Sequence, residues 1–289
     1  MPRAVTTDKV SLFYKDWGPR DGSPIVLMHG WPLTADTFDD LAVALAEDGY
    51  RSIVPDRRGF GRSDQAWDGY DYDTFASDVE AVLEDAEING PFAIAGFSMG
   101  GGEVAKLVAR HKERITKAIL IGSVVPYMLQ TDDNPNGVPQ SVFDQIMAGI
   151  TKDRADFFTG FAKDFYGVGV MQHPVSDAVL HDFFRQAMMA GLRPTLGAAQ
   201  AFATTDFRPD LDHFTMPTLI IHGTKDATVP IDATAREVKK AVPDAQLIEY
   251  DGSAHGLFAS DKDRLTADIR EFLGTAATQR SAIPLGQSA

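Results

Sequence analysis

The 289-residue sequence contains no cysteine, which excludes disulfide bonds, thiol nucleophiles and thiolate metal ligands. It also lacks any run of about 18 apolar residues, the length that a membrane-spanning helix needs. Residues 1–8 show no apolar stretch of the kind that a signal peptide carries. We therefore expect a cytoplasmic protein that has no membrane partner.

Positive charge is scarce as well. The sequence has 27 Lys and Arg residues against 41 Asp and Glu residues, so its formal net charge is −14. Because nucleic-acid binding requires a basic surface, no nucleic-acid partner is expected. Six of the seven histidines show no His-x-x-x-His or histidine–carboxylate pattern of a metal site, so the sequence predicts no bound metal; they are His29, His111, His173, His181, His213 and His222.

Apolar runs and helical patterns alternate along much of the chain. Strands are predicted at 10–17, 25–28, 51–54, 92–95, 118–121, 218–221 and 246–250, the first two joined as a hairpin by a turn at 18–23. Helices are predicted at 35–47, 72–87, after residue 98, at 233–241 and at 261–273. This alternation is typical of an α/β protein with a mostly parallel, doubly wound sheet.

Residues 126–212 interrupt the alternation, because they carry helical patterns but no clear strand. The helical segments are predicted at 142–150, 154–165, 176–190 and 194–204. We expect a hydrolase-like core of residues 1–125 and 213–273, a helical cap of residues 126–212 and a tail of residues 274–289. A minority of the cap's large apolar side chains are expected to line an acyl pocket, and the rest to pack inside the cap; the candidates are Phe143, Met147, Phe157, Phe158, Phe161, Met188 and Phe202.

The segment Gly96-Phe97-Ser98-Met99-Gly100 is the most specific motif in the chain. It follows an apolar run and precedes a helical pattern, which is the context of a nucleophile elbow. In such an elbow a strained turn presents a serine hydroxyl beyond the end of a strand, and flanking glycines avoid collisions. The sequence therefore predicts that Ser98 is a nucleophile and that Gly96 and Gly100 shape its turn.

An acid and a histidine follow the serine in the chain. Asp226 comes after the apolar run 218–221, and His255 comes after the run 246–250. Because parallel strands end at one edge of a sheet, these side chains are expected to converge there. A serine needs an imidazole to take its proton, and the imidazole needs a carboxylate to fix its tautomer. We predict the triad Ser98–Asp226–His255, with Asp251 as the alternative acid.

A second loop supplies candidate residues for the same site. The apolar run 25–28 ends in His29-Gly30-Trp31-Pro32, where a turn can offer a backbone N–H to an oxyanion. His29 is predicted to order this loop, whereas the other histidines outside the triad, His222 among them, are predicted to be structural or solvated. The glycine-rich segment 56–63 lacks the Lys-Ser/Thr of a phosphate loop and is predicted to be a structural turn near the site.

Together these motifs resemble the cofactor-free bacterial haloperoxidases, α/β-hydrolases grouped with bacterial aryl esterases and perhydrolases. The resemblance covers about residues 10–273 and rests on segments 29–32, 56–63, 96–104, 221–226 and 254–256. It implies an α/β-hydrolase fold with an eight-stranded sheet and a helical cap, and no cofactor. It also leaves room for a homo-oligomer.

The resemblance implies particular roles and substrates. In that family the oxyanion is held by two backbone N–H groups, which correspond to Met99 and Trp31 here. Members that favour perhydrolysis carry a proline after the tryptophan, and Pro32 matches. The implied enzyme is a serine esterase that takes a small acyl ester or carboxylic acid and accepts hydrogen peroxide at the acyl-enzyme, which yields a peracid that oxidises halide in solution.

The same triad is also compatible with a lactonase, an amidase or lactamase, or a C–C hydrolase. A dehalogenase or epoxide hydrolase is disfavoured, since those relatives need a carboxylate where Ser98 stands. The alternative from another class is a non-catalytic binding module, which would have no need of a complete triad.

Overall fold

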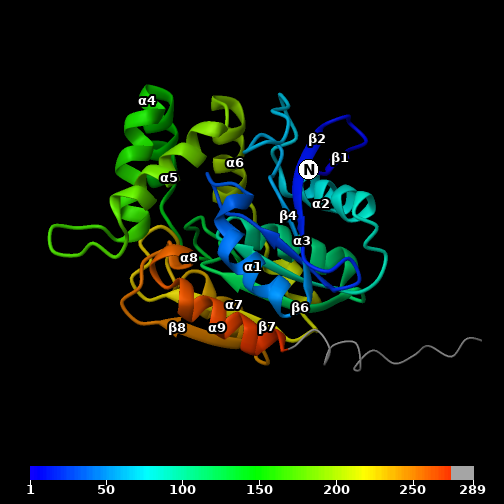
Figure 1. Cartoon of the computed structure of the whole chain (residues 1–289). Helices are drawn as coiled ribbons and strands as arrows, with labels where there is room; N and C mark the ends of the chain where they lie inside the picture. The colour runs from blue at the N-terminus through cyan, green and yellow to red at the C-terminus, as the bar shows by residue number, and fades with distance from the viewer. Residues whose placement is uncertain (275–289) are drawn as a thin grey trace, which may run out of the picture.

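A computed structural model describes residues 1–274 of the chain (Figure 1). Within this range one eight-stranded sheet has the order β1-β2-β4-β3-β5-β6-β7-β8. The β1–β2 and β2–β4 pairs are antiparallel, and every other neighbouring pair is parallel. This is the mostly parallel sheet that the sequence predicts. The strands are β1 (Arg3–Val5), β2 (Ser11–Trp17), β3 (Ser23–Met28), β4 (Tyr50–Pro55), β5 (Phe92–Phe97), β6 (Ile115–Ile121), β7 (Thr218–Gly223) and β8 (Gln246–Tyr250).

The hairpin predicted between residues 10–17 and 25–28 is wrong. β2 pairs with β1 on one side and with β4 on the other, so β4 separates β2 from β3. β3 lies between two parallel partners, β4 and β5, and a run that is apolar on both faces favours such an enclosed place. The hairpin at the N-terminus is formed instead by β1, which is too short to leave a periodic pattern, and β2.

Helices cover both faces of the sheet. On one face α1 (Asp39–Glu47) packs against α9 (Lys262–Leu273), and on the other α2 (Tyr72–Asp85) packs against α3 (Gly100–His111). α7 (Ala235–Ala241) packs against β7 and β8. Short helical turns complete the core: η1 (Ala35–Phe38), η2 (Arg208–His213) and α8 (Leu257–Ser260). The central strands β5 and β7 are buried at every position, as expected for strands covered on both faces.

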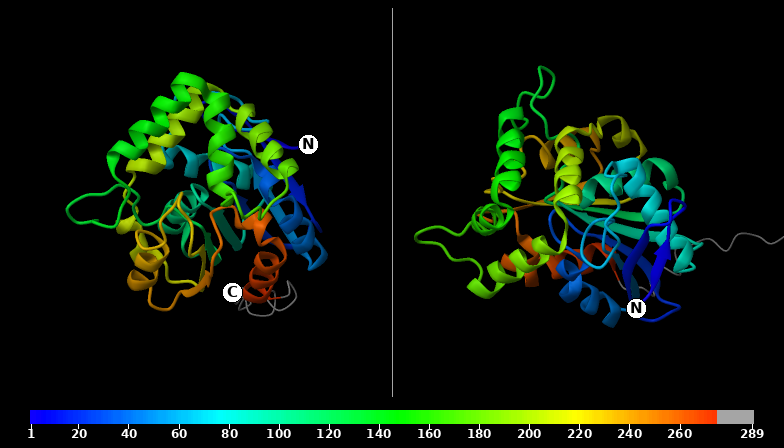
Figure 2. Two further views of the ribbon diagram at one scale, coloured as in Figure 1. Left: turned by 90° about the vertical axis from the view of Figure 1, so that its left-hand side faces the viewer. Right: turned by 90° about the horizontal axis from the view of Figure 1, so that it is seen from above.

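Three α-helices lie between β6 and β7 in the described chain, and we keep the term cap for them. They are α4 (Gln140–Tyr166), α5 (Asp177–Met189) and α6 (Leu192–Thr204), and α4 packs against both of the others. α4 contains the two helices predicted at 142–150 and 154–165. Asp153 between them leaves helical geometry (φ −157°), and its carboxylate caps the second helix by accepting the N–H of Asp156 (3.0 Å). Figures 1 and 2 show the cap gathered at one end of the molecule, opposite α7 and α9.

No helix in residues 1–274 is both long enough and apolar enough to cross a membrane. The tail predicted for residues 274–289 lies outside the described residues, apart from Gly274.

Candidate active site

Ser98 occupies a tight turn between β5 and α3. Its φ of +54° is a left-handed conformation that is uncommon for a residue with a side chain. Two glycines permit this turn by close approach: a Cβ on Gly96 would lie 2.3 Å from the carbonyl oxygen of Gly100, and a Cβ on Gly100 would lie 2.2 Å from that of Met28. The serine N–H donates to the carbonyl of Ile121 (2.8 Å), which fixes the turn to the end of β6.

The residues predicted as a triad form one chain of hydrogen bonds. Nε2 of His255 lies 2.9 Å from Oγ of Ser98, and Nδ1 of His255 lies 2.5 Å from Oδ2 of Asp226. Each residue follows a different strand, β5, β7 or β8, at the carboxyl edge of the sheet. This geometry assigns the Nδ1–H tautomer to His255, so that Nε2 is free to accept the serine proton.

Asp226 is held as a carboxylate by its surroundings. Its Oδ1 accepts the N–H groups of Thr228 (2.9 Å) and Val229 (2.8 Å). Burial raises the pKa of this carboxyl, but charge interaction with His255 and hydrogen bonds from His222 and His255 outweigh burial and hold the pKa well below its ordinary value. The alternative acid, Asp251, is exposed and accepts a hydrogen bond from the Thr224 hydroxyl (3.2 Å), whereas Asp226 is the acid in contact with His255.

His222 is a contributor to the site that the sequence analysis missed. It is fully buried, and its Nε2 lies 2.8 Å from the carbonyl oxygen of Val229 and 3.3 Å from Oδ2 of Asp226. The sequence carried a weak signal, since His222 stands four residues before Asp226 in the strand-end segment 221–226. A strand pattern, however, does not reveal which way a turn will direct the acid.

The catalytic histidine candidate is also packed by aromatic rings. The ring of His255 lies 4.9 Å from that of Phe97 and 4.8 Å from that of Phe165, measured between centroids. Phe165 belongs to α4, and its carbonyl accepts the N–H of Gly256 (3.0 Å). The cap therefore contacts the histidine loop directly.

Residues 29–34 form the loop after β3, which we call the oxyanion loop. Nε2 of His29 accepts the N–H of Arg57 (3.0 Å), so Nδ1 carries the proton that it donates to the carbonyl of Gly30 (2.9 Å). Burial, followed by the charge of Arg57, holds the pKa of His29 well below its ordinary value, which keeps the ring neutral. Pro32 follows Trp31 through a cis peptide bond.

The two backbone N–H groups predicted to hold an oxyanion are those of Trp31 and Met99. Within the described part of the chain neither one donates a hydrogen bond to another protein group. Met99 directly precedes α3, whose N-terminus contributes a positive dipole end. Both groups are therefore available to a ligand, and their role remains a proposal.

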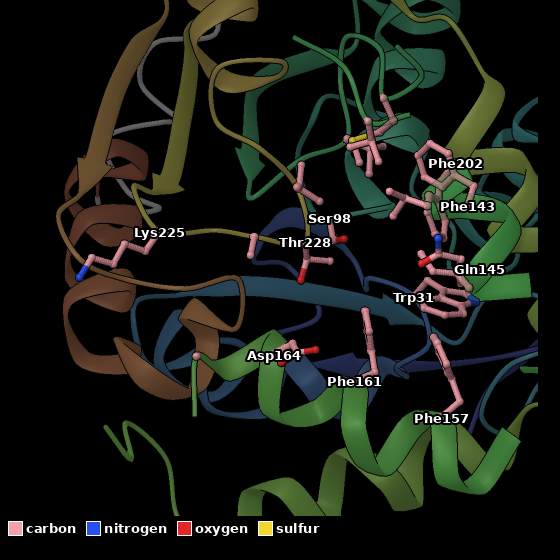
Figure 3. A pocket seen from close by; sticks show the side chains of 18 of the residues that line it. Trp31, Ser98, Phe143, Gln145, Phe157, Phe161, Asp164, Phe202, Lys225 and Thr228 are labelled. Carbon is pink, nitrogen blue, oxygen red and sulfur yellow. The ribbon is translucent and has the colours of Figure 1, made fainter. Parts of the chain in front are cut away.

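A cavity of about 570 Å³ lies between Ser98 and the cap. Figure 3 shows the labelled aromatic side chains gathered to one side of Ser98 and Thr228, with Lys225 furthest away. Four of the seven cap side chains considered above line the cavity, so the expectation that only a minority would do so is wrong. The cavity-lining members of that set are Phe143, Phe157, Phe161 and Phe202.

The reason lies in the helix orientation. α4 and α6 both contribute side chains to the cavity wall, whereas Phe158, also on α4, is fully buried and does not line the cavity. Its neighbours Phe157 and Phe161 stack on each other at 5.6 Å and face the space above Ser98. An apolar stripe at helical spacing does not reveal whether protein or a cavity faces it.

Comparison with known proteins agrees with this geometry. A family model described as alpha/beta hydrolase fold matches residues 23–262. A non-heme chloroperoxidase from Kitasatospora aureofaciens is 41% identical over 276 residues, which cover 94% of this chain and 99% of that protein. A bifunctional esterase/perhydrolase from Acinetobacter calcoaceticus is 39% identical over 275 residues, with the same coverage of both chains. The solved structure of a bromoperoxidase from Bacillus anthracis matches with a TM-score of 0.89 at 38% identity, covering 94% of this chain and 99% of that chain.

The chain therefore belongs to the α/β-hydrolase fold family. Within that family it belongs with the bacterial non-heme haloperoxidases and esterase/perhydrolases, as its motifs predict. Among residues 1–274 no three or more His, Asp or Glu side chains are grouped to hold a metal ion. The lack of a cofactor stays a prediction.

Proposed function

We propose that this protein is a serine esterase that also transfers its acyl group to hydrogen peroxide. The observation that carries the proposal is the Ser98–His255–Asp226 hydrogen-bond chain, with distances of 2.9 and 2.5 Å, beneath an apolar cavity. The names of two relatives, a non-heme chloroperoxidase and a bifunctional esterase/perhydrolase, support both the esterase activity and the transfer to peroxide.

The first half-reaction forms an acyl-enzyme. Oγ of Ser98 attacks the ester carbonyl carbon while Nε2 of His255 takes the hydroxyl proton, and Asp226 stabilises the resulting imidazolium. The negative charge on the former carbonyl oxygen is held by the N–H groups of Met99 and Trp31. Each of these donors is expected to contribute roughly 3 kcal/mol of transition-state stabilisation. His255 then gives its proton to the departing alcohol.

The second half-reaction decides between hydrolysis and perhydrolysis. Water or hydrogen peroxide gives a proton to Nε2 of His255 and attacks the acyl carbon, and the proton returns to Oγ as the serine ester bond breaks. Water yields a carboxylic acid, and peroxide yields a peracid that oxidises halide outside the site. A carboxylic acid can acylate Ser98 by the reverse path. The substrates proposed are thus a small acyl ester or carboxylic acid, and hydrogen peroxide.

The division into a core of residues 1–125 and 213–273 and a cap of residues 126–212 is part of this proposal. The core would supply the reacting groups, and the cap would supply the aromatic walls of the acyl cavity. Phe157 and Phe161 on α4 and Phe202 on α6 support this division of labour.

The experiment compares the native protein with Ser98→Ala on a panel of esters, lactones and amides, each with and without peroxide and bromide. Ester turnover and peracid formation are both expected to disappear in Ser98→Ala. The control is Ser77→Ala, since Ser77 is an exposed serine on α2. Halogenation that persists in Ser98→Ala would contradict a shared acyl-enzyme, and a preference for lactones or amides would reassign the substrate class.

A further inference from the structure

Gln186 is a buried cap residue that contacts the oxyanion loop. It lies on α5, and only 4% of it is exposed. Its Oε1 accepts the N–H of Thr34 (3.2 Å) and the hydroxyl of Thr34 (2.9 Å), while its Nε2 donates to Oδ2 of Asp182 (2.7 Å). Only this orientation of the amide satisfies all three contacts, because a flipped amide would set its N–H groups against the N–H of Thr34 and its oxygen against the carboxylate of Asp182.

A second cap contact holds the same loop. The indole Nε1 of Trp31 donates to the carbonyl of Thr195 on α6 (3.0 Å). The Trp31 ring also packs against three cap rings at centroid distances between 5.4 and 5.6 Å, those of Phe158, Phe161 and Phe202. The side chain of Trp31 is thus bound by the cap, while its backbone N–H is the proposed oxyanion donor.

The core holds the loop at its two ends and buries the side chain of Leu33. At the start, Nη2 of Arg57 donates to the carbonyl of His29 (2.7 Å), and at the end the N–H of Ala35 donates to Oδ1 of Asp56 (2.6 Å). Between these anchors the loop is neither helix nor strand, so its backbone position depends on the few groups that bind it. Within the loop the N–H of Leu33 donates to the carbonyl of Gly30 (3.0 Å), and the carbonyl of Thr34 accepts the N–H of Thr37 (3.1 Å). The cap adds two contacts from outside, Thr195 at Trp31 and Gln186 at Thr34.

We propose that Gln186 is a positioning residue that sets the Trp31 N–H of the oxyanion hole through Thr34. The inference rests on the proposed function, since it gives the cap a role in acyl transfer beyond lining the cavity. A small displacement of a catalytic group lowers the rate of the chemical step strongly. By holding the Trp31 N–H in place, the cap therefore affects the turnover rate and not only substrate affinity.

The test uses Gln186→Met, which keeps the length of the side chain and removes its hydrogen bonds. Its matched control is Gln200→Met, an exposed glutamine on α6. For a short acyl ester, kcat of Gln186→Met is expected to fall by roughly 10- to 100-fold, while KM changes less than about twofold. Affinity for a trifluoromethyl ketone, which forms a tetrahedral oxyanion on the serine, is expected to fall in the same proportion.

A conservative rescue separates positioning from simple support of the fold. In the double variant Gln186→Glu/Asp182→Asn the carboxylate still accepts from Thr34, and the new amide donates to it in turn. Its kcat is expected to lie within about threefold of Asp182→Asn alone. A purely structural role for Gln186 would instead lower the melting temperature of Gln186→Met and leave its kcat, measured on the folded fraction, unchanged, which would overturn the inference.

A second measurement tests the inference without an ester substrate. It is the rate at which a fluorophosphonate modifies Ser98. That reaction also develops charge on an oxygen in the oxyanion hole. If the native protein reacts with the probe but hydrolyses no ester, the proposed function fails. The inference still stands if Gln186→Met reacts roughly tenfold more slowly than Gln200→Met, and it falls if the two react equally fast.

Discussion

Arg57 and Glu103 form an ion pair that is closed to solvent on every side. Nε and Nη2 of Arg57 lie 2.6 and 2.5 Å from the two carboxylate oxygens, and the side chains are 1% and 0% exposed. The same guanidinium donates to the carbonyl of His29 (2.7 Å). The pair therefore joins the helix behind the nucleophile to the start of the oxyanion loop.

Glu103→Gln is expected to destabilise the fold by about 3 kcal/mol or more, because it leaves the Arg57 charge buried without its counter-charge. The matched control is Glu80→Gln, whose partners Arg110 and His111 are partly exposed and whose ion pairs are worth at most about 1 kcal/mol. The measurement is the free energy of unfolding in urea. Equal losses in the two variants would contradict the role given to the buried pair.

Ser98, His255 and Asp226 could be predicted because the neighbouring sequence of each one carries a recognisable signal. Ser98 sits in a motif whose glycines are required by contacts within the turn itself. Asp226 and His255 each follow an apolar run, and parallel strands bring such ends together whatever the order of the strands. The order of the strands could not be obtained in this way, since the position of β4 beside β2 depends on pairing between distant residues.

Asp226→Asn is expected to keep the fold and to lower kcat by roughly 10⁴-fold, because an amide leaves His255 in the wrong tautomer. The measurement is ester kcat, accompanied by circular dichroism to confirm folding. Near-native turnover would assign the role of the acid to another residue, and Asp251→Asn is the variant to examine next.

The contacts that Gln186 and His222 make could not be predicted from the sequence, for a physical reason. Gln186 reaches Thr34 across 152 positions of sequence, and His222 reaches Asp226 only because the turn after β7 folds back on itself. Neither residue type is unusual where it stands. Such contacts are set by how the cap and the turn pack, which a one-dimensional pattern does not contain.

His29 is expected to make the protein less stable below about pH 6.5, the ordinary pKa of histidine. In the folded protein, burial and the charge of Arg57 hold the pKa of His29 well below that value. In this pH range the unfolded chain therefore binds a proton at His29 and the folded chain does not. The stability that this neutral histidine contributes is fully present above pH 6.5. It decreases as the pH drops below 6.5, by at most about 1.4 kcal/mol per pH unit for one proton.

The check is urea denaturation of the native protein and His29→Gln at pH 7.5 and pH 5.0. The glutamine carbonyl can still accept the N–H of Arg57, but it does not titrate. The variant is expected to lose less stability between the two pH values than the native protein. The same loss in both would mean that His29 is already protonated in the fold.

Pro32 is expected to favour peroxide over water. Proline fixes its own φ and has no N–H, so it restricts where the carbonyl of Trp31 can point. That carbonyl, beside the proposed oxyanion donor, can accept a hydrogen bond from the distal O–H of peroxide, a group that water does not have. Pro32→Leu should therefore lower the ratio of perhydrolysis to hydrolysis while ester turnover survives.

The ratio is best measured by partitioning. One short acyl ester is mixed with peroxide, and peracid and carboxylic acid are quantified from the same acyl-enzyme, so that differences in acylation cancel. The control for a general change in the loop is Leu33→Met, because Leu33 is the next residue and is buried. If Pro32→Leu and the native protein partition alike, then Pro32 sets only the geometry of the loop, and the preference for peroxide must come from elsewhere in the cavity.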